Sequence, residues 1–260
     1  MLHRHGRQPS WILWKLYEQN EPNTVYLCDE SIDLWTIPLT NIGDRFQDHE
    51  QSLSADERQR ASRFRSAKHR RRFTLARGSL RSILSQYLGT SAKAVRFSYG
   101  THGKPRLANT HEPPLEFNLS HAGEYALCAL TKNHSIGIDI EKIRNTDPDY
   151  YLRLATRFFS RKEFEAIKAA PEHHRTLFFF SCWTRKEAYL KRHGVGLRLP
   201  LSGFTVNVDP TESARLIDTP WRPEDLMITL LQDLPAPRGY QTALAIASPQ
   251  LKNIRHYTSS

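Results

Sequence analysis

The run Gly137-Ile138-Asp139-Ile140-Glu141 decides how the rest of this sequence is interpreted. Its alternation of apolar and polar residues predicts a β-strand, in which successive side chains point to opposite faces. Asp139 and Glu141 then share one face, while Ile138 and Ile140 point into the core. Two adjacent carboxylates repel each other unless a cation lies between them. All-oxygen ligation suits Mg²⁺, with Mn²⁺ as a possible substitute, so the pair predicts a metal site.

A third carboxylate lies in Trp183-Thr184-Arg185-Lys186-Glu187-Ala188-Tyr189-Leu190-Lys191, which has helical character. Trp183, Glu187 and Leu190 follow i, i+4, i+7 spacing, which predicts that Glu187 faces the core. A buried, unpaired Glu is costly, and a metal shared with the strand carboxylates would remove that cost. The alternative is a solvated strand edge together with a Glu187–Lys191 pair on the helix surface. Taken together, the three carboxylates favour the metal.

Composition places the chain among soluble globular proteins larger than one typical domain. It has 260 residues, of which 39% are hydrophobic and 25% charged. No apolar run approaches the ~20 residues that span a bilayer, and the N-terminal apolar run is too short for a signal peptide. The three cysteines are isolated, so we expect them to be small buried residues in a reducing cytoplasm: Cys28, Cys128 and Cys182.

The net charge of +10 is concentrated in one segment. Ten basic residues and no acidic ones lie between Arg58 and Arg81, and the remaining chain is balanced in charge. Such a segment attracts a polyanion, which could be nucleic acid, a phosphorylated cofactor or an acidic protein. The alternative is a helix face that only aids solubility, and the absence of acidic residues from the segment weakens it.

This basic segment is predicted to be helical. Ser54 and Glu57 have the spacing of a capping box, and apolar residues recur every three to four positions from Phe73 to Leu88. Gly89 is expected to end the second helix. Arg72 lies beside the first residue of that apolar stripe, so it is well placed to reach an anion near a helix N-terminus.

Short strands and turns follow in the first half. The turn Gly100–Pro105 ends in a proline that forces Lys104 into an extended conformation, which should project its ammonium group from a rigid corner. The alternative is a plain surface turn. Residues 132–134 are expected to form a hairpin into the Asp139 strand. The other predictions for this half are strands at 31–39, 94–99, 115–119 and 125–130, with 120–123 between the last two.

The second half repeats the same order of elements after a predicted linker at 145–149. Helices are expected at 161–169 and 175–192, with strands near 204–208, 226–231 and 242–247. The predicted fold class is therefore α+β, with two similar α+β subdomains and the metal strand near their junction. The predicted division is an unassigned extension at 1–30 and subdomains at 31–144 and 145–260.

Five ordered motifs together resemble those of the 4′-phosphopantetheinyl transferases, in the larger, monomeric, pseudo-dimeric type that activates surfactin synthetase. The resemblance covers about Ser54 to Ser202. It implies a pseudo-two-fold fold with the active site at the junction of its halves. It also implies transfer of phosphopantetheine from coenzyme A to a serine of an apo acyl, peptidyl or aryl carrier protein, with release of adenosine 3′,5′-bisphosphate. The motifs are Gly103–Pro105, Phe117–His121, Gly137–Glu141, Phe158–Ser160 and Trp183–Lys191.

The resemblance also implies roles for individual residues. Glu187 would take the proton of the serine hydroxyl, and Lys191 and Lys186 would steady the developing charge. Glu57 occupies a position where some relatives have a lysine, so the cation at the 3′-phosphate stays open. Three carboxylates would hold Mg²⁺ against the pyrophosphate: Asp139, Glu141 and Glu187. The residues expected to contact coenzyme A are Arg72, Lys104, Ser120, His121 and Lys186.

Two other functions remain as alternatives. A Mg²⁺-dependent nuclease, or another nucleic-acid-binding protein, would use the same carboxylates for chemistry and the Arg58–Arg81 segment for backbone contacts. Aromatic residues are sparse in that segment, and no nucleic-acid motif accompanies it. A module that binds coenzyme A or a carrier without catalysis would have no need of three carboxylates. We therefore expect neither nucleic acid nor membrane as a partner.

The expected partner is an acidic carrier protein, which a basic enzyme would attract electrostatically. We place its docking site on Phe158-Phe159-Ser160 and the helix that starts near Arg161, with Arg161 and Lys162 as exposed cations. The alternative for Phe158 and Phe159 is a role in the core alone. The chain is expected to act as a monomer in the cytoplasm.

Overall fold

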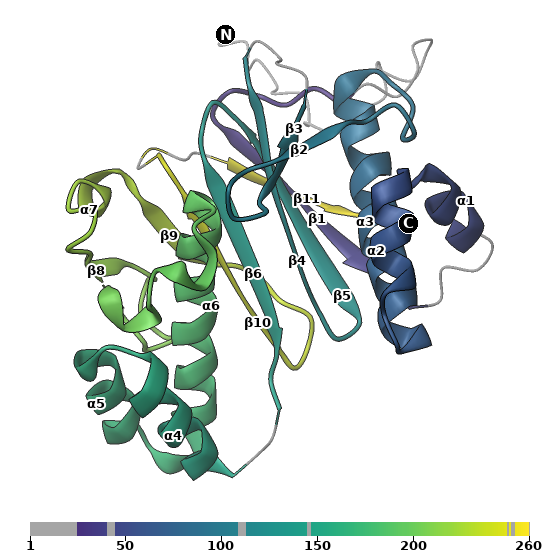
Figure 1. The fold of residues 1–260 in the computed structure, drawn as a ribbon. Coiled ribbons are helices and arrows are strands. Elements are labelled where there is room, and N and C mark those ends of the chain that lie inside the picture. Colours follow the sequence, from purple (N-terminus) through teal and green to yellow (C-terminus); the bar gives the residue numbers. More distant parts are fainter. Residues whose placement is uncertain are drawn as a thin grey trace, which may run out of the picture.

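The computed structural model describes residues 25–40, 45–108, 113–144, 147–248, 250 and 253–259. Most of the expected N-terminal extension (1–24) and two residues of the expected linker (145–146) lie outside these ranges. Figure 1 shows two sheets side by side, with helices α1–α3 flanking one of them and α4–α6 the other. The α+β prediction is confirmed.

The first sheet has the strand order β11-β1-β5-β4. Its strands are β1 (Ser31–Pro38), β4 (Leu115–Ala122), β5 (Tyr125–Lys132) and β11 (Asn253–Thr258). Strand β1 pairs antiparallel with β5 and parallel with β11, and β4 pairs antiparallel with β5. Helix α3 (Ala67–Leu88) covers the outer face of this sheet, and their shared core includes Leu75, Leu80, Leu84, Ile37, Phe117, Cys128 and Leu130.

The second sheet has the order β6-β10-β9 and is antiparallel throughout. It consists of β6 (Ile136–Lys142), β9 (Leu230–Asp233) and β10 (Tyr240–Ile246). Helix α6 (Arg175–His193) packs on its outer face, and their core includes Cys182, Ala188, Leu190, Leu231, Ala243 and Ala245.

A third core lies between the two sheets. Ile138 and Ile140 of β6 pack there with Leu34 of β1 and Leu127 of β5. Because side chains alternate along a strand, Asp139 is then directed to the opposite face, toward α6. The predicted alternation of β6 is confirmed, and Asp139 lies between the second sheet and α6.

Gly137 explains how close α6 comes to this strand. A Cβ atom on Gly137 would overlap the carbonyl oxygen of Ala188 and the backbone nitrogen of Arg192. Only a residue without a side chain allows the helix to pass at this distance. The glycine at the start of the strand motif therefore brings Glu187 and Lys191 beside Asp139.

Smaller elements complete the two halves. In the first half they are α1 (Arg45–Ser52), α2 (Ala55–Ser62), β2 (Phe97–Tyr99) and β3 (Pro105–Leu107). In the second half they are α4 (Pro148–Phe158), α5 (Arg161–Ala169), β7 (Thr205–Val206), β8 (Leu216–Asp218) and α7 (Asp225–Ile228), with 3₁₀ turns at Glu172–His174, Gly196–Arg198 and Leu201–Gly203. No helix in the described residues combines the length and apolar character that crossing a bilayer requires.

Several helix boundaries agree with the sequence. The carboxylate of Glu57 accepts a hydrogen bond from the backbone N–H of Ser54 at 2.8 Å, so the predicted capping box is present. Gly89 ends α3 in the left-handed conformation, with φ 57°. A second capping box, Ser160 with Glu163, begins α5.

Four sequence expectations are wrong. Strand β6 pairs with β10 rather than forming a hairpin with β5, because β6 faces the first sheet across the central core. Residues 120–122 continue β4 past its predicted end at 119. Residues 225–228 are the short helix α7, and the strand starts only at Leu230. Cys28 is exposed, whereas Cys128 and Cys182 are buried.

The proposed boundary at residue 144 divides the chain but not its sheets. Strand β11, from the C-terminal half, pairs with β1 of the first sheet. Strand β6, from the N-terminal half, pairs with β10 of the second. Each half of the chain therefore supplies a strand to the sheet of the other half.

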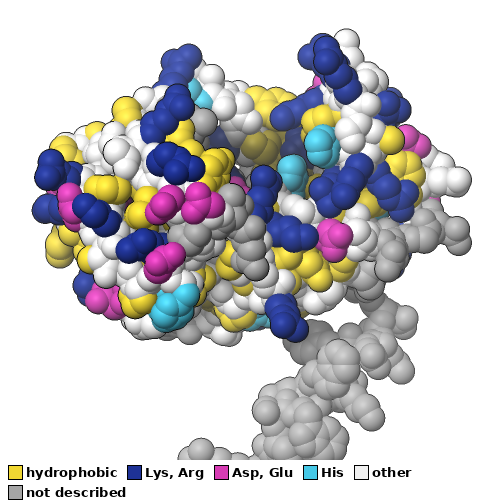
Figure 2. Space-filling model, turned by 90° about the horizontal axis from the view of Figure 1, so that it is seen from below, with side chains coloured by type: hydrophobic (Ala, Val, Ile, Leu, Met, Phe, Trp, Pro, Cys, Tyr) yellow, Lys and Arg dark blue, Asp and Glu magenta, His cyan; other side chains and the backbone are white. Residues whose placement is uncertain are grey.

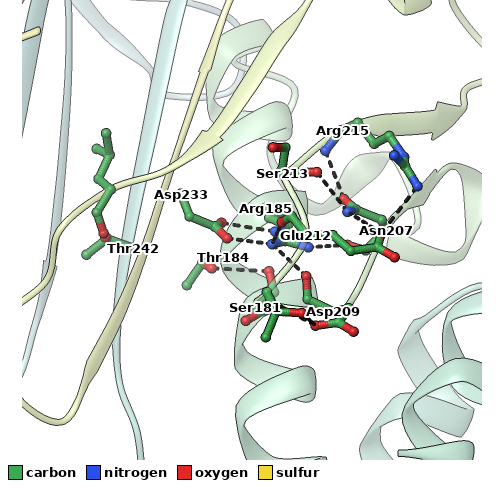
Figure 3. A network of polar contacts seen from close by, with 12 residues as sticks. Ser181, Thr184, Arg185, Asn207, Asp209, Glu212, Ser213, Arg215, Asp233 and Thr242 are labelled. Carbon is green, nitrogen blue, oxygen red and sulfur yellow. Dashed lines mark hydrogen bonds and ion pairs between the residues drawn. The ribbon is translucent and has the colours of Figure 1, made fainter.

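Arg185 anchors the segment that follows α6 (Figure 3). It is fully buried, and its guanidinium group donates to both carboxylate oxygens of Asp233, at 2.5 and 3.0 Å. It also donates to the carbonyl oxygens of Asn207, Asp209 and Glu212. This side chain closes the end of the second sheet onto the turn of α6 that carries Glu187.

Candidate active site

Asp139 is the centre of the site. Its side chain is buried, and Oδ1 accepts hydrogen bonds from Lys191 Nζ at 2.5 Å and from Ser120 Oγ at 2.9 Å. Lys191 Nζ also donates to Ser120 Oγ at 2.8 Å. The second oxygen, Oδ2, is buried and has no hydrogen-bond partner in the part of the chain that the structure describes. Strands β4 and β6 and helix α6 thus meet at one carboxylate.

Glu141 and Glu187 share the electrostatic environment of Asp139. Burial, and then the charge of Asp139, raise the pKa of Glu141 to about 7. Burial and the charge of Asp139 also raise the pKa of Glu187, which Lys191 partly opposes. The effect of the Asp139 charge on both glutamates indicates that the three predicted carboxylates lie close together.

The carboxylates of the site do not converge on a single point. In the described part of the chain, no group of three or more His, Cys, Asp or Glu side chains converges closely enough to hold a metal ion as it stands. The ammonium group of Lys191 is the cation that pairs with Asp139. The unpaired Oδ2 of Asp139 and the all-oxygen donor set nevertheless fit a hard divalent cation.

The prediction that Trp183, Glu187 and Leu190 form a core-facing stripe on α6 is only partly correct. Leu190 is buried in the core, but Trp183, Glu187 and Lys191 are half-buried and follow i, i+4, i+8 spacing. The other residues of α6 between Phe179 and Arg192 are buried, so this stripe is the one that borders the site. Lys191 forms its ion pair with Asp139, and not with Glu187 as in the alternative interpretation of a pair on the helix surface.

Cations from α2 and α3 reach the other side of the site. Part of the His121 side chain is exposed, but burial of the rest lowers the pKa of its imidazole. The positive charges of Lys191, Arg72 and Arg60 lower this pKa further. Arg72 is half-buried at the start of α3. Lys191, Arg72 and Arg60 therefore each lie within electrostatic range of His121.

The basic segment is not uniform. Arg77 and Arg81 are buried and bind the two carboxylate oxygens of Glu57 at 2.5 and 2.6 Å. The expectation that no acid compensates this segment is wrong for these two, because Glu57 immediately precedes it. The other eight cations take part in no ion pair among the described residues: Arg58, Arg60, Arg63, Arg65, Lys68, Arg70, Arg71 and Arg72. Figure 2 shows Lys and Arg side chains gathered on this side, around exposed His side chains.

The side chain of Lys104 is hydrogen-bonded to the protein's own backbone. Its ammonium group donates to the carbonyl oxygens of Ile136 at 2.9 Å and Arg192 at 3.0 Å. Burial lowers its pKa to about 8. The side chain also packs against Gly194, where a Cβ atom would crowd it. Lys104 does not project from a free corner, as expected, but ties that corner to the start of β6 and the end of α6.

Lys186 lies outside the site. It is fully buried and forms an ion pair with Glu163 of α5 at 2.7 Å, and it donates to the carbonyl oxygens of Leu201 and Phe204. Its neighbour Glu187 faces the site because adjacent residues of a helix point in different directions. The structure therefore corrects the predicted contact of Lys186 with coenzyme A, and gives this residue a structural role.

A pocket with a volume of about 350 Å³ lies next to Glu141. Its walls are mostly aromatic, and it includes Trp183 of the α6 stripe. Sequence reasoning missed this pocket, because its residues come from three separated segments and look like ordinary core residues. The others that line it are Lys142, Arg144, Tyr150, Tyr151, Leu154, Phe179 and Phe180.

Asn118 is a second residue that sequence reasoning did not single out. Its Oδ1 accepts a hydrogen bond from the backbone N–H of Ile138 at 2.9 Å, although β4 and β6 belong to different sheets. Asn118 and Ser120 are two residues apart on β4 and so share a face. That spacing was the signal that could have identified Asn118.

Comparison with known families agrees with this geometry. A family model described as "4'-phosphopantetheinyl transferase superfamily" matches residues 135–245, and one described as "4'-phosphopantetheinyl transferase, N-terminal" matches residues 40–133. The transferase HetI of a Nostoc species is 44% identical over 200 residues, which cover 76% of this chain and 83% of that protein. The chain belongs to the 4′-phosphopantetheinyl transferase superfamily.

More distant members of the superfamily also match. The 4′-phosphopantetheinyl transferase Sfp of Bacillus subtilis is 33% identical over 156 residues, or 60% of this chain and 66% of that protein. A crystal structure of holo-[acyl-carrier-protein] synthase from Thermotoga maritima is 16% identical, with a TM-score of 0.35, and covers 45% of this chain and 64% of that one. The family assignment rests on the sequence matches. The predicted family and enzyme class are confirmed, and nothing in these comparisons supports a nuclease.

Proposed function

We propose that this transferase moves the 4′-phosphopantetheine group of coenzyme A to a serine of an apo carrier protein, releasing adenosine 3′,5′-bisphosphate. The observation that carries this proposal is the buried Asp139 with its unpaired Oδ2. It lies between two further carboxylates and a cation-rich helix start. An anionic diphosphate and a divalent cation together match this combination of charges.

The metal ligands in this proposal are Asp139, Glu141 and Glu187. The charge of Asp139 raises the pKa values of Glu141 and Glu187, so a cation beside them would be stabilising, and oxygen donors suit Mg²⁺, with Mn²⁺ as a substitute. When bound there, Mg²⁺ would neutralise charge on the pyrophosphate.

Glu187 is the proposed general base. The serine oxygen bonds to the phosphorus atom that carries the pantetheine arm, and the bond from this phosphorus to the oxygen bridging the two phosphates breaks. The serine proton goes to Glu187, whose pKa is raised by burial, which makes it a stronger base than an exposed Glu. Lys191 lies beside Asp139, where its charge can stabilise the leaving phosphate.

The phosphates of coenzyme A would bind on the side of Arg72 and His121. Arg60, which acts on His121 electrostatically, also lines a second pocket together with Arg63 and Tyr99. Cations and an aromatic ring suit a phosphorylated nucleoside, so this pocket is the proposed place for the adenosine end. The aromatic pocket beside Glu141 is then free for the pantetheine arm.

The carrier would approach over α4 and α5. Arg161 and Lys162 are exposed there, and Figure 2 shows Lys and Arg side chains on this side as well. Phe159 is buried in the core and Phe158 packs partly against it, so both residues position the segment rather than form the docking surface. The two halves of one chain supply both sides of the site, and we propose that the enzyme acts as a monomer.

The direct test is a transfer assay with coenzyme A, Mg²⁺ and a panel of apo carrier proteins, read as the mass of each carrier. We expect one carrier serine to gain a phosphopantetheine group. Asp139→Asn and Glu187→Gln should each lower the transfer rate by at least about 10³-fold, a loss typical of groups that act only in the transition state. Near-normal turnover of Asp139→Asn at saturating Mg²⁺ would refute the three-carboxylate site.

A further inference from the structure

The two oxygens of Asp139 have different surroundings. Oδ1 accepts two hydrogen bonds, from Lys191 and from Ser120. Oδ2 accepts none from the described residues, although Asp139 is only 2% exposed. A buried carboxylate oxygen without a partner is costly, so a structure that satisfies one oxygen twice and leaves the other bare is unusual.

The single hydrogen of the Ser120 hydroxyl is used by this arrangement. The hydroxyl donates it to Asp139 Oδ1 and accepts a hydrogen bond from Lys191 Nζ. A serine hydroxyl has a single hydrogen, so it cannot donate to a phosphate oxygen at the same time. Ser120 is itself buried, at 6% exposure. Its hydroxyl is therefore directed to the carboxylate and not to an incoming cofactor.

The fold determines this direction. Strands β4 and β6 lie together without sharing a backbone ladder, and side chains of β4 bridge the gap. Asn118 bridges to the backbone N–H of Ile138, and Ser120, on the same face of β4, bridges to the carboxylate of the next residue. The Asn118 contact fixes the register of the two strands, and so places the Ser120 hydroxyl at Oδ1.

We propose that Ser120 is a positioning residue for the metal ligand: with Lys191 it holds Oδ1 of Asp139 and leaves Oδ2 alone to bind the metal. This inference rests on the proposed metal-dependent function. It replaces the role in cofactor binding that the family resemblance implied. Binding through one oxygen suits the compact octahedral shell of Mg²⁺ or Mn²⁺ and disfavours Ca²⁺, which often takes both oxygens of a carboxylate.

The test measures metal affinity directly, by titrating the whole protein with Mn²⁺ and following the signal of free Mn²⁺ by electron paramagnetic resonance. Loss of a hydrogen bond to a metal ligand typically weakens metal binding about 10–100-fold, and we expect a change of this size for Ser120→Ala. Ser120→Thr keeps the hydroxyl and should restore binding. Ser181→Ala is the matched control. Like Ser120→Ala it removes a buried hydroxyl, but the hydroxyl of Ser181 has no hydrogen-bond partner among the described residues.

The alternative role predicts a different pattern. If Ser120 bound a phosphate of coenzyme A, Ser120→Ala would leave the Mn²⁺ affinity unchanged and raise the KM for coenzyme A even at saturating metal. That result would overturn the inference. Ser120→Cys, which keeps the side-chain volume and donates only weakly, gives the same comparison if the alanine variant is unstable. Failure of the wild-type protein to bind Mn²⁺, with or without coenzyme A, would instead refute the metal site of the proposed function.

Discussion

Gly137 of β6 lies directly against the backbone of Ala188 in α6, with no room for a side chain between them. The contact sets the distance between the strand that carries Asp139 and Glu141 and the helix that carries Glu187 and Lys191. Because both elements are buried in packed cores, neither can move away easily.

Gly137→Ala should therefore disturb both stability and the site. We expect a loss of about 1–3 kcal/mol in the free energy of unfolding, the usual cost of overpacking, together with weaker Mn²⁺ binding. Urea denaturation and metal titration measure the two effects. Gly203→Ala is the control, because its new Cβ atom would lie 3.6 Å from the nearest atom, an ordinary contact. Equal behaviour of the two variants would contradict this account of α6.

The raised pKa of Glu141 predicts how the stability of the metal-free protein depends on pH. Its pKa is about 7 in the folded protein, against an ordinary value of 4.5. The folded state thus holds its proton more tightly, and stability is lost as the pH rises from 4.5 to 7. Glu141→Gln should be more stable than the wild type by about 1–2 kcal/mol above pH 7, and equal to it below pH 4.5.

Urea denaturation at pH 4 and pH 8 in the presence of a chelator measures this difference. Saturating Mg²⁺ at pH 8 should abolish or reverse it, since the cation stabilises the ionised wild-type group. A variant no more stable than the wild type at pH 8 would show that Glu141 is not under electrostatic strain.

Substitutions of Arg72 and Lys104 should have different effects on the enzyme. Removing the charge of Arg72 should raise the KM for coenzyme A about tenfold, with a smaller change in kcat, because a phosphate contact away from the reacting bond contributes to uniform binding. Lys104→Met should instead lower the melting temperature, since it leaves two carbonyl oxygens without their donor.

Steady-state kinetics with coenzyme A and its 3′-dephosphorylated form separates these roles. We expect Lys104→Met to keep the wild-type ratio of affinities for the two compounds. A loss of that ratio in Lys104→Met, with unchanged stability, would return Lys104 to the phosphate site. The same assay on Arg60→Ala tests whether this residue meets the 3′-phosphate.

Arg161 and Lys162 test the carrier surface. Reversing both to Glu should raise the KM for the carrier about tenfold or more and leave that for coenzyme A unchanged, because an acidic partner is then repelled. The side chain of Arg161 is 91% exposed and forms only a loose pair with Glu165, so the change should not affect folding.

The same charge reversal at Lys93 and Arg96 is the control, since both are exposed near the far end of α3. Transfer by the wild type should slow with added salt at low carrier concentration, and less so for the Arg161 and Lys162 variant. If only the control variant loses carrier affinity, the carrier docks on the first half of the chain.

Local patterns in the sequence were enough for many elements. The alternation around Asp139 gave strand β6, the spacing of Ser54 and Glu57 gave the start of α2, and Gly89 marked the end of α3. Each depends on interactions within a few residues, which a sequence displays directly. The hairpin before β6 was wrong because strand pairing also depends on distant partners, here β10.

The roles of the lysines could not be determined in this way. Three lysines look alike in the sequence but have different partners. Lys186 forms an ion pair with Glu163, and Lys191 forms one with Asp139. Lys104 donates to two carbonyl oxygens. Long flexible side chains reach in any direction, so their partners depend on which elements pack beside them. The same applies to Arg77 and Arg81, which turn inward to Glu57.

The sequence by itself determined the transferase family, through its ordered motifs, and predicted the residues that carry the chemistry: three carboxylates and a cation-rich helix start. Spacing along the chain encodes these features, because strand and helix periodicity place residues on a common face. Only the tertiary structure decided that Ser120 and Lys191 meet on one oxygen of Asp139 and leave the other bare. That outcome depends on β4, β6 and α6 being brought together by two sheets and their cores, and contacts between such distant segments are set by packing of the whole chain.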